Sequence, residues 1–277
     1  MDELVARLRA AGCVFAEDEA RIITEAADGD AARLEELVAA RVGGLPLEHL
    51  VGWAELDGRR WRVAPGVFVP RQRSELLVRE ATVRAAGDGT AVGTVLLVDL
   101  CCGCGALGGA VAARLLATGR DVEIHAADVD PAAVACAHDN LKTLADDAAA
   151  ARAGVLTAHT LVGDLADPLE AEVWGRVDVL VANAPYVPTA AISLMPPEAR
   201  EHEPHAALDG GGDGLAILRR VIDLAPKLLR RGGHLLVETG DGQVSAAVGH
   251  MTAAGLRATV LSDDELGATA LAATLPE

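Results

Sequence analysis

From residue 94 onward, short apolar runs alternate with segments of helical spacing, and this alternation constrains the fold more than any other feature of the chain. Apolar runs of strand length that are separated by helices are typical of parallel sheets with both faces covered. The expected strands are residues 95–100, 122–128, 155–162, 177–182, 234–239, 257–262 and 268–274. A short turn joins the last two, so we expect a terminal hairpin that adds one antiparallel strand. The sequence therefore predicts an α/β fold with a seven-stranded, mainly parallel sheet.

The residues before this sheet carry different patterns. Residues 1–52 have helical spacing and little strand signal, which indicates a small N-terminal helical domain. Residues 53–72 begin with alternating polarity and turn at Asp57-Gly58, which predicts a hairpin linker. Ser74 is expected to cap the helix that follows the linker. We therefore expect a third part, the main domain, over residues 73–277.

The balance of charge limits the class of substrate. The 277 residues carry 41 acidic and 24 basic side chains, which gives a formal net charge of −17. An acidic surface repels phosphate backbones, so a nucleic-acid substrate is disfavoured, although a local basic cleft would permit one. The first residues lack the basic and then apolar pattern of a secretion signal, and no apolar run reaches membrane-spanning length. We expect a soluble, cytoplasmic protein with no membrane partner.

Five cysteines raise the question of disulfides and metals. Cys101, Cys102 and Cys104 are too close in sequence for a relaxed structural disulfide, which favours a reducing compartment. No second Cys/His pair stands at zinc-site spacing from them. His202 and His205 are a weaker candidate, because the Pro between them argues against a helix that would place both on one face. We therefore expect no metal.

The first expected strand leads into a glycine-rich turn that ends at Gly108. Gly103 and Gly105 let the backbone approach a ligand closely, and the start of the next helix offers free N–H groups. The spacing of the three glycines also fits the dinucleotide fingerprint, with Asp128 at the second strand end placed to accept hydrogen bonds from a ribose. Both NAD and S-adenosylmethionine contain a ribose. The glycine motif alone therefore leaves these two cofactors open.

Two acidic residues favour S-adenosylmethionine over NAD. Asp99 would crowd a pyrophosphate with negative charge, but it suits the cationic methionine part of S-adenosylmethionine. After the third strand, Asp164 and Leu165 supply a carboxylate and a backbone edge where adenine would lie. The alternative for Asp164 is a plain turn residue or a helix cap.

The fourth expected strand is followed by the tetrapeptide Asn183-Ala184-Pro185-Tyr186. The Asn183 side-chain oxygen and a backbone carbonyl beside Pro185 can each accept one N–H of a planar NH2 group. The ring of Tyr186, the sole tyrosine, can cover the flat face of that group. Methylation of an amide or of an exocyclic amine requires a site that binds and orients the NH2 group in this way. The alternative for Tyr186 is that it simply caps the core at a strand end.

These loops and several other segments make the chain resemble the HemK/PrmC family of protein-glutamine methyltransferases over nearly its whole length. The matching segments are residues 44–52, 69–78, 99–105, 183–186, 202–211 and 232–238. The resemblance implies a Rossmann-like S-adenosylmethionine-dependent methyltransferase with a helical arm that helps to dock a protein substrate. It implies methyl transfer to a glutamine amide nitrogen, most directly in the Gly-Gly-Gln loop of a peptide-release factor. The implied catalytic residues are Asn183, Ala184, Pro185 and Tyr186. The implied cofactor-binding residues are Asp99, Cys101, Gly103, Gly105, Asp128, Asp164, Leu165 and Asn183.

The chain departs from the family pattern at three places, one of which is the C-terminal segment 264–269, Asp-Glu-Leu-Gly-Ala-Thr, which lacks the family's usual Arg. Ala184 stands where the family usually has Pro, and residues 70–75 read Pro-Arg-Gln-Arg-Ser-Glu where Pro-Arg-Pro-Glu-Thr-Glu is usual. The Ala184 carbonyl can still accept a hydrogen bond, but the loop is less restricted without the first Pro. A divergent member with another protein target is therefore one alternative. A methyltransferase acting on a nucleic-acid base, an NAD-dependent oxidoreductase and a non-catalytic cofactor-binding protein also remain open.

Overall fold

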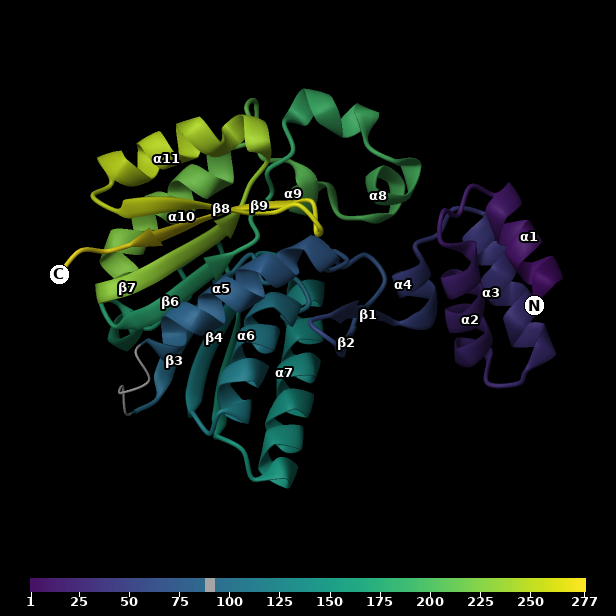
Figure 1. The fold of residues 1–277 in the computed structure, drawn as a ribbon, viewed down its shortest axis with the longest axis horizontal. Coiled ribbons are helices and arrows are strands. Elements are labelled where there is room, and N and C mark those ends of the chain that lie inside the picture. Colours follow the sequence, from purple (N-terminus) through teal and green to yellow (C-terminus); the bar gives the residue numbers. More distant parts are fainter. Residues whose placement is uncertain (88–92) are drawn as a thin grey trace.

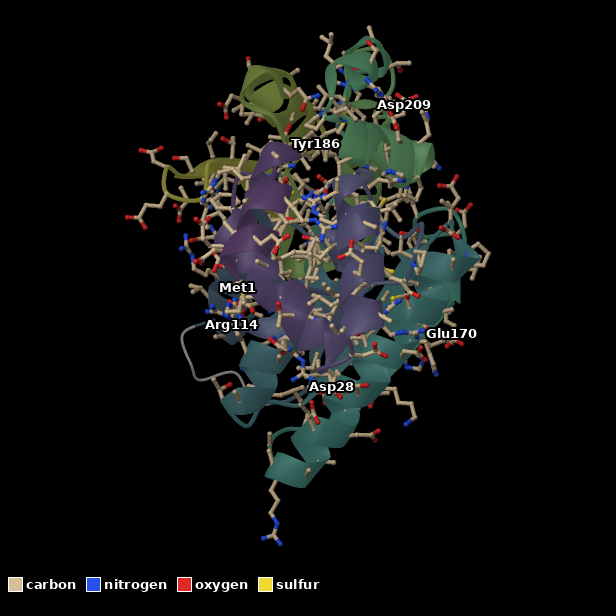
Figure 2. The ribbon with its side chains drawn as sticks, turned by 90° about the vertical axis from the view of Figure 1, so that its right-hand side faces the viewer. Met1, Asp28, Arg114, Glu170, Tyr186 and Asp209 are labelled. Carbon is tan, nitrogen blue, oxygen red and sulfur yellow. The ribbon has the colours of Figure 1, made fainter. Side chains whose placement is uncertain are left out.

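The computed structural model describes residues 1–87 and 93–277. Figure 1 shows a group of N-terminal helices that is joined through a small hairpin to a larger α/β body. Figure 2 views the molecule from the side of that group, which lies in front of the body. Among the described residues, no helix combines the length and the apolar character that a membrane crossing requires.

The main sheet has seven strands in the order β5-β4-β3-β6-β7-β9-β8. Their bounds are β3 Val95–Leu100, β4 Val122–Asp128, β5 Leu156–Val162, β6 Val177–Ala182, β7 Leu229–Glu238, β8 Arg257–Asp263 and β9 Ala268–Thr274. The neighbouring pairs from β5 to β7 are parallel, whereas β9 runs antiparallel to both β7 and β8. The predicted mainly parallel sheet with a terminal hairpin is therefore confirmed.

One strand differs in length from its prediction. β7 begins at Leu229, not at residue 234, and its pairing with β6 shifts register between Val177 and Val179. Gly232 and Gly233 lie inside this early part of the strand. A glycine pair normally indicates a turn, so the sequence does not predict that the strand already begins at Leu229.

Helices cover both faces of the sheet, as apolar side chains that alternate along β3 require. Leu97 faces one core, while Leu96 and Val98 face the other. The first core includes residues of α5 (Glu75–Ala86), α6 (Ala106–Ala117) and α7 (Pro131–Ala151). The second includes residues of α10 (Ala216–Leu228) and α11 (Val244–Ala253). Asp130 caps α7 through a hydrogen bond from the Ala132 N–H.

The N-terminal helices have a small core of their own. They are α1 (Asp2–Ala10), α2 (Ala16–Ala27), α3 (Ala31–Val42) and α4 (Leu47–Val51), and they bury Leu8, Ile23 and Leu37. We call α1–α4 the arm. β1 (Trp53–Leu56) and β2 (Arg59–Arg62) then form the hairpin, with φ of 56° at Asp57 and 68° at Gly58. Two consecutive left-handed residues are what a tight two-residue hairpin turn requires.

Short helices lie in the remaining connections. They are η1 (Gln72–Ser74), η2 (Ala171–Val173), η3 (Thr189–Leu194), α8 (Pro197–His202), α9 (His205–Leu208) and η4 (Asp241–Gln243). The expected side-chain cap by Ser74 is wrong. Ser74 has helical dihedrals (φ −69°, ψ −6°), so its hydroxyl does not face the first N–H groups of α5 and instead donates to Glu238.

Candidate active site

A cavity of about 370 Å³ lies at the carboxyl ends of β3, β4, β5 and β6. The chain leaves β3 toward β4 on one side, whereas β6 pairs with β3 on the other. Open α/β sheets bind ligands at such a point, because the loops after the two central strands diverge there. Linker residues Phe68 and Pro70 close another part of the wall. The fold therefore places the loop after β3 and the tetrapeptide after β6 around one cavity.

Six of the residues expected to bind a cofactor line this cavity. They are Cys101, Gly103, Asp128, Asp164, Leu165 and Asn183. Asp99 and Gly105 do not line it. Asp99 lies behind the loop with its side chain fully buried, and its Oδ2 accepts the Gly108 N–H at 2.9 Å. A Cβ at Gly108 would lie 2.8 Å from that oxygen, so the close approach requires glycine.

The second oxygen of Asp99 is the notable part of this arrangement. Oδ1 is buried and has no hydrogen-bond partner in the described part of the chain. Burial, only partly offset by the Gly108 N–H, raises the pKa of Asp99 to about 7. Burying a charged oxygen without a hydrogen-bond donor costs free energy. The surroundings of Asp99 therefore favour either a protonated carboxyl group or a cationic group bound in the adjacent cavity.

Asp128 lies at the end of β4 and shapes the cavity wall. Its Oδ2 accepts the Gly103 N–H at 2.9 Å and its Oδ1 accepts the Asp130 N–H at 3.0 Å. Each carboxylate oxygen has a further lone pair, so both can still accept a hydroxyl. Burial raises the pKa of Asp128, and the two backbone N–H groups counter that effect. This carboxylate suits a vicinal diol such as that of a ribose.

Asp164, which follows β5, lines the cavity as well and is held by an ion pair. Its Oδ2 lies 2.8 Å from Nη2 of Arg220, and both side chains are about half exposed. Leu165 follows with a φ of 51°, a left-handed conformation that is rare for a leucine. The left-handed residue gives the turn a defined shape, and Leu165 lines the cavity beside Asp164.

The charge of the lining distinguishes between the two cofactors. Carboxylates of Asp128, Asp130 and Asp164 lie on the wall, and no lysine or arginine of the described residues does. A pyrophosphate would meet these charges without a cation to balance it, whereas a sulfonium compound carries a positive charge. The residues present therefore fit S-adenosylmethionine and disfavour NAD.

The tetrapeptide divides between two hollows. Asn183 and Pro185 line the large cavity, and Ala184 is buried behind them. Tyr186 lines a smaller hollow of about 180 Å³ together with Arg73 and Glu238. The ring that was expected to cover the acceptor therefore faces this second hollow. Figure 2 labels Tyr186 near the top of the view, beyond the arm.

A hydrogen-bonded group holds Tyr186 in place. Its hydroxyl donates to Oε1 of Glu238 at 2.8 Å, and Nε of Arg73 donates to the same oxygen at 2.7 Å. Arg73 also donates to the Tyr186 oxygen through Nη2. Burial, together with the Glu238 carboxylate, raises the pKa of Tyr186 well above its ordinary value. Tyr186 is therefore a neutral hydrogen-bond donor in the physiological range and does not act as a base.

Sequence reasoning did not identify Arg73, Ser74 and Glu238 as members of the site. Ser74 was assigned to a local cap, and Arg73 was noted only as a departure from a family pattern. Glu238 did carry a signal, because it is an acidic residue at the end of an expected buried strand beside β6. A buried acid at a strand end requires partners, and those partners come from η1 and from the tetrapeptide.

The cysteines of the loop do not offer nucleophiles. All five cysteines are free, and those of the loop lie in or under the cavity wall. Burial raises the pKa of Cys101, Cys102 and Cys104, with nearby Asp99 and Asp128 adding to the effect for the first two. The thiolate form that attacks substrates is therefore suppressed.

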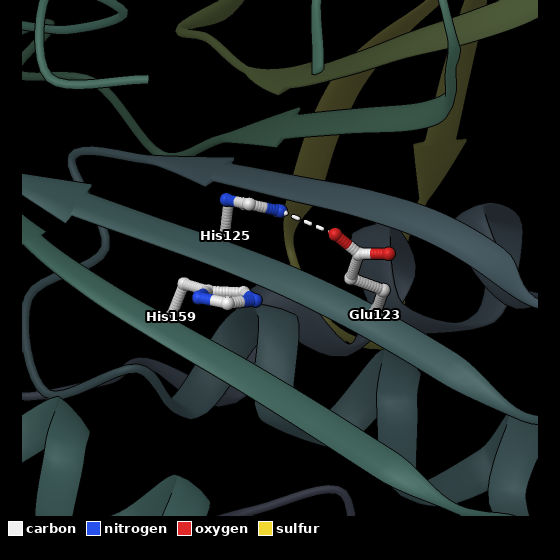
Figure 3. A group of neighbouring side chains, drawn as sticks. All are labelled: Glu123, His125 and His159. Atoms are coloured by element: carbon white, nitrogen blue, oxygen red, sulfur yellow. Dashed lines mark hydrogen bonds and ion pairs between the residues drawn. The ribbon is translucent and has the colours of Figure 1, made fainter. Parts of the chain in front are cut away.

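Two groups of histidines lie outside this chemistry. His202 ends α8 and His205 begins α9, with Pro204 between the two helices. Glu123, His125 and His159 lie together on β4 and β5, and Figure 3 shows the two rings stacked. Their centroids are 4.4 Å apart at an interplanar angle of 16°. Ring nitrogens bind metals along the ring plane, so nearly parallel rings do not aim at one point. None of the three lines the cavity.

The chain is similar in sequence to known proteins. No protein-family model matches the chain. It is 36% identical over 219 residues to a release factor glutamine methyltransferase of Geobacter sulfurreducens, a match that covers 79% of this chain and 69% of that protein. It is 35% identical over 228 residues to the one of Moorella thermoacetica, covering 82% and 73%.

Solved structures show the same fold at low identity. A T. thermophilus 16S rRNA N2 G1207 methyltransferase in complex with AdoMet and guanosine matches with a TM-score of 0.53 at 21% identity, over 80% of this chain and 49% of that one. The N-terminal domain of human METTL16 in complex with SAH matches with a TM-score of 0.52 at 15% identity, over 88% and 84%.

Proposed function

Because the chain belongs to the family of release factor glutamine methyltransferases, we propose that it methylates the side-chain amide nitrogen of a protein glutamine. The methyl donor is S-adenosylmethionine, and the substrate is the Gly-Gly-Gln loop of a peptide-release factor. One observation supports this most directly. Asn183 and Pro185 stand on the wall of a carboxylate-lined cavity at the carboxyl ends of the sheet.

We assign the cofactor to the large cavity. Asp128 would hold the ribose hydroxyls, and Asp164 with the backbone of Leu165 would hold the adenine edge. The backbone at Cys101 and Gly103 would lie along the methionine part, with Asp99 supplying negative charge from behind the loop. When bound, S-adenosylmethionine supplies a methyl group activated by a positive sulfur.

The protein's part in the transfer is to orient a poor nucleophile. An amide nitrogen is weakly nucleophilic because its lone pair is delocalised into the carbonyl. We propose that the Asn183 Oδ1 and the Ala184 carbonyl accept its two hydrogens, while Pro185 forms a wall. Accepting the hydrogens fixes the direction of the nitrogen and increases its electron density, which lowers the barrier through orientation and electrostatics. One nitrogen-bound proton is released to water as the new N–C bond forms and the bond between the methyl group and sulfur breaks, which leaves S-adenosylhomocysteine.

The arm is our proposed docking element for the release factor. Val14 and Phe15, at the turn before α2, are 81% and 70% exposed. Large apolar side chains exposed together are typical of contact surfaces between proteins. The exposed turn would thus hold the body of the substrate while its glutamine enters the cavity beside Asn183.

Calorimetry combined with the Asn183→Ala variant tests the assignment. The wild-type protein should bind S-adenosylhomocysteine, and NAD should give no heat of binding. Asn183→Ala should bind S-adenosylhomocysteine within about tenfold of wild type, but its transfer rate should fall by about 10²-fold or more. Near-normal turnover of Asn183→Ala would remove Asn183 from the mechanism. Binding of NAD in place of S-adenosylhomocysteine would overturn the proposed class of enzyme.

A further inference from the structure

A chain of hydrogen bonds connects a buried carboxylate to the side chain of Asn183. Glu238, at the end of β7, is only 3% exposed. Its Oε2 accepts the Ser74 hydroxyl at 2.7 Å. The Ser74 oxygen in turn accepts from Nδ2 of Asn183 over a longer distance of 3.4 Å. These residues are far apart in sequence, and η1 at the end of the linker brings Ser74 between the other two.

The buried carboxylate of Glu238 fixes the direction of the hydrogen bonds that connect it through Ser74 to Asn183. A carboxylate only accepts hydrogen bonds, so the Ser74 hydroxyl must donate to Glu238. The lone pairs of the Ser74 oxygen then remain for a donor, and the only donor of the Asn183 side chain is its NH2 group. An asparagine amide can turn over to exchange its oxygen and nitrogen, and its hydrogen-bond partners decide which way it points. Here the partners place Nδ2 toward Ser74 and leave Oδ1 for the cavity.

We propose that Glu238, acting through the Ser74 hydroxyl, is a positioning residue that keeps the Asn183 oxygen turned toward the acceptor amide. The inference rests on the proposed function for the identity of that acceptor. In the reversed orientation, the NH2 group of Asn183 would face the NH2 group of the substrate glutamine, and two donors cannot form a hydrogen bond. The orientation of Asn183 therefore decides whether the site can hold an amide nitrogen.

The two oxygens of Glu238 have separate partners, which keeps Oε2 free for Ser74. Oε1 accepts from Nε of Arg73 and from the Tyr186 hydroxyl. Arg73 and Ser74 both belong to η1, and Tyr186 belongs to the same tetrapeptide as Asn183. Glu238 thus connects η1 and the tetrapeptide at two points. A purely structural ion pair between Arg73 and Glu238 would need neither the Ser74 hydroxyl nor its contact with Asn183.

Nuclear magnetic resonance can read the orientation without any turnover, because the sequence contains only two asparagines, Asn140 and Asn183. Asn140 donates to the carbonyls of Arg62 and Cys104 at 2.9 Å and 2.8 Å, so it serves as an internal control. Protein with ¹⁵N-labelled asparagine should give two pairs of side-chain NH2 signals. In Ser74→Ala and in Glu238→Gln, the Asn183 pair should shift and the Asn140 pair should stay in place.

Kinetics of the same variants against a peptide-release factor complete the test. Ser74→Ala and Glu238→Gln should lower kcat by roughly 10- to 100-fold, with the KM for S-adenosylmethionine changed less than about threefold. Ser74→Thr keeps the hydroxyl and should restore most of the turnover and the wild-type Asn183 signals. Ser262→Ala, on β8, is the matched control and should change neither.

The outcomes separate this inference from the proposed function. Unchanged Asn183 signals and unchanged kcat in Ser74→Ala would overturn the positioning role, and Ser74→Ala answers the question even if Glu238→Gln does not fold. A loss of kcat in Ser74→Ala that Ser74→Thr does not restore would also contradict it. If the wild-type protein binds S-adenosylhomocysteine but methylates no release factor, while the Asn183 signals still respond to Ser74→Ala, the proposed substrate fails and the positioning device stands.

Discussion

At the scale of single residues, the site depends on carboxyl groups placed where water cannot reach them. Glu238 has partners for both of its oxygens, whereas Oδ1 of Asp99 has none in the described part of the chain. A satisfied carboxylate can order its neighbours, as proposed for Asn183. An unsatisfied one responds to pH and to charge. Asp99 is therefore the residue at which cofactor binding and protonation should be coupled.

The pH dependence of stability should report on Asp99. Its pKa is about 7 in the folded protein and about 3.9 in an unfolded chain, so the folded state binds the proton more tightly. The stability from this group is fully present below pH 4 and is lost as pH rises through 7. Asp99→Asn cannot titrate. The free energy of unfolding of Asp99→Asn minus that of wild type should therefore rise by roughly 2–3 kcal/mol between pH 5 and pH 8.

Urea unfolding of both proteins at the two pH values measures this difference. Each comparison is made at one pH, so the other titrating groups cancel to first order. A difference that stays the same at pH 5 and pH 8 would show that Asp99 does not change its protonation in this range.

Residues at strand ends are the part of the site that sequence could predict. Asp128 and Asn183 each follow an apolar run, and parallel strands bring such positions to one edge of a sheet. The partnership of Ser74 with Glu238 spans 164 positions and leaves no local pattern. A serine before a helix is usually an N-cap. The sequence therefore predicts a local role for Ser74 and gives no sign of its hydrogen bond to Glu238. The direction of the Tyr186 ring depends on the same distant carboxylate.

At the scale of elements, the hairpin and α6 meet in a close contact. Trp61 on β2 is 1% exposed and its indole N–H donates to the Leu56 carbonyl at 3.1 Å. A Cβ at Gly109, inside α6, would lie 2.6 Å from the Trp61 ring. The hydrogen bond and the burial leave the ring little room to move. The absence of a side chain at Gly109 is therefore what lets the hairpin pack on α6.

Two glycine substitutions in helices should have opposite effects on stability. Gly109→Ala gains about 1 kcal/mol of helix propensity but must displace Trp61, at a cost of about 1–3 kcal/mol, so net destabilisation is expected. Gly249→Ala, inside α11, meets no atom within 4 Å and should stabilise the protein by about 0.5–1 kcal/mol. Urea unfolding measures both. Equal changes of the same sign would contradict the packing argument.

The hairpin itself could be predicted, because Asp57-Gly58 between alternating residues is a strong local signal. Its packing partner could not be predicted. A glycine inside a helical pattern reads only as a weak point of the helix, and nothing local indicates that an indole ring fills its place. The early start of β7 was missed for a related reason, because Gly232 and Gly233 resemble a turn.

At the scale of the whole molecule, both the protein as a whole and the wall of its cavity are acidic. The chain has a net charge of −17, and the cavity wall carries carboxylates and no lysine or arginine of the described residues. Both features favour a cationic cofactor and disfavour a polyanionic substrate. The class of fold could be predicted because strand and helix patterns alternate over most of the chain. The division of the tetrapeptide between two hollows could not, because it depends on the contacts of η1 with Glu238 on β7.

Methyl transfer from labelled S-adenosylmethionine, with mass-spectrometric localisation of the product, tests the central claim most directly. A purified peptide-release factor and total RNA are offered in parallel to wild type and to Asn183→Ala. With wild type, one methyl group is expected on the glutamine of the Gly-Gly-Gln loop, and on the order of 10²-fold less with Asn183→Ala. Label on an RNA base, or no label on the release factor from a protein that binds S-adenosylhomocysteine, would contradict it.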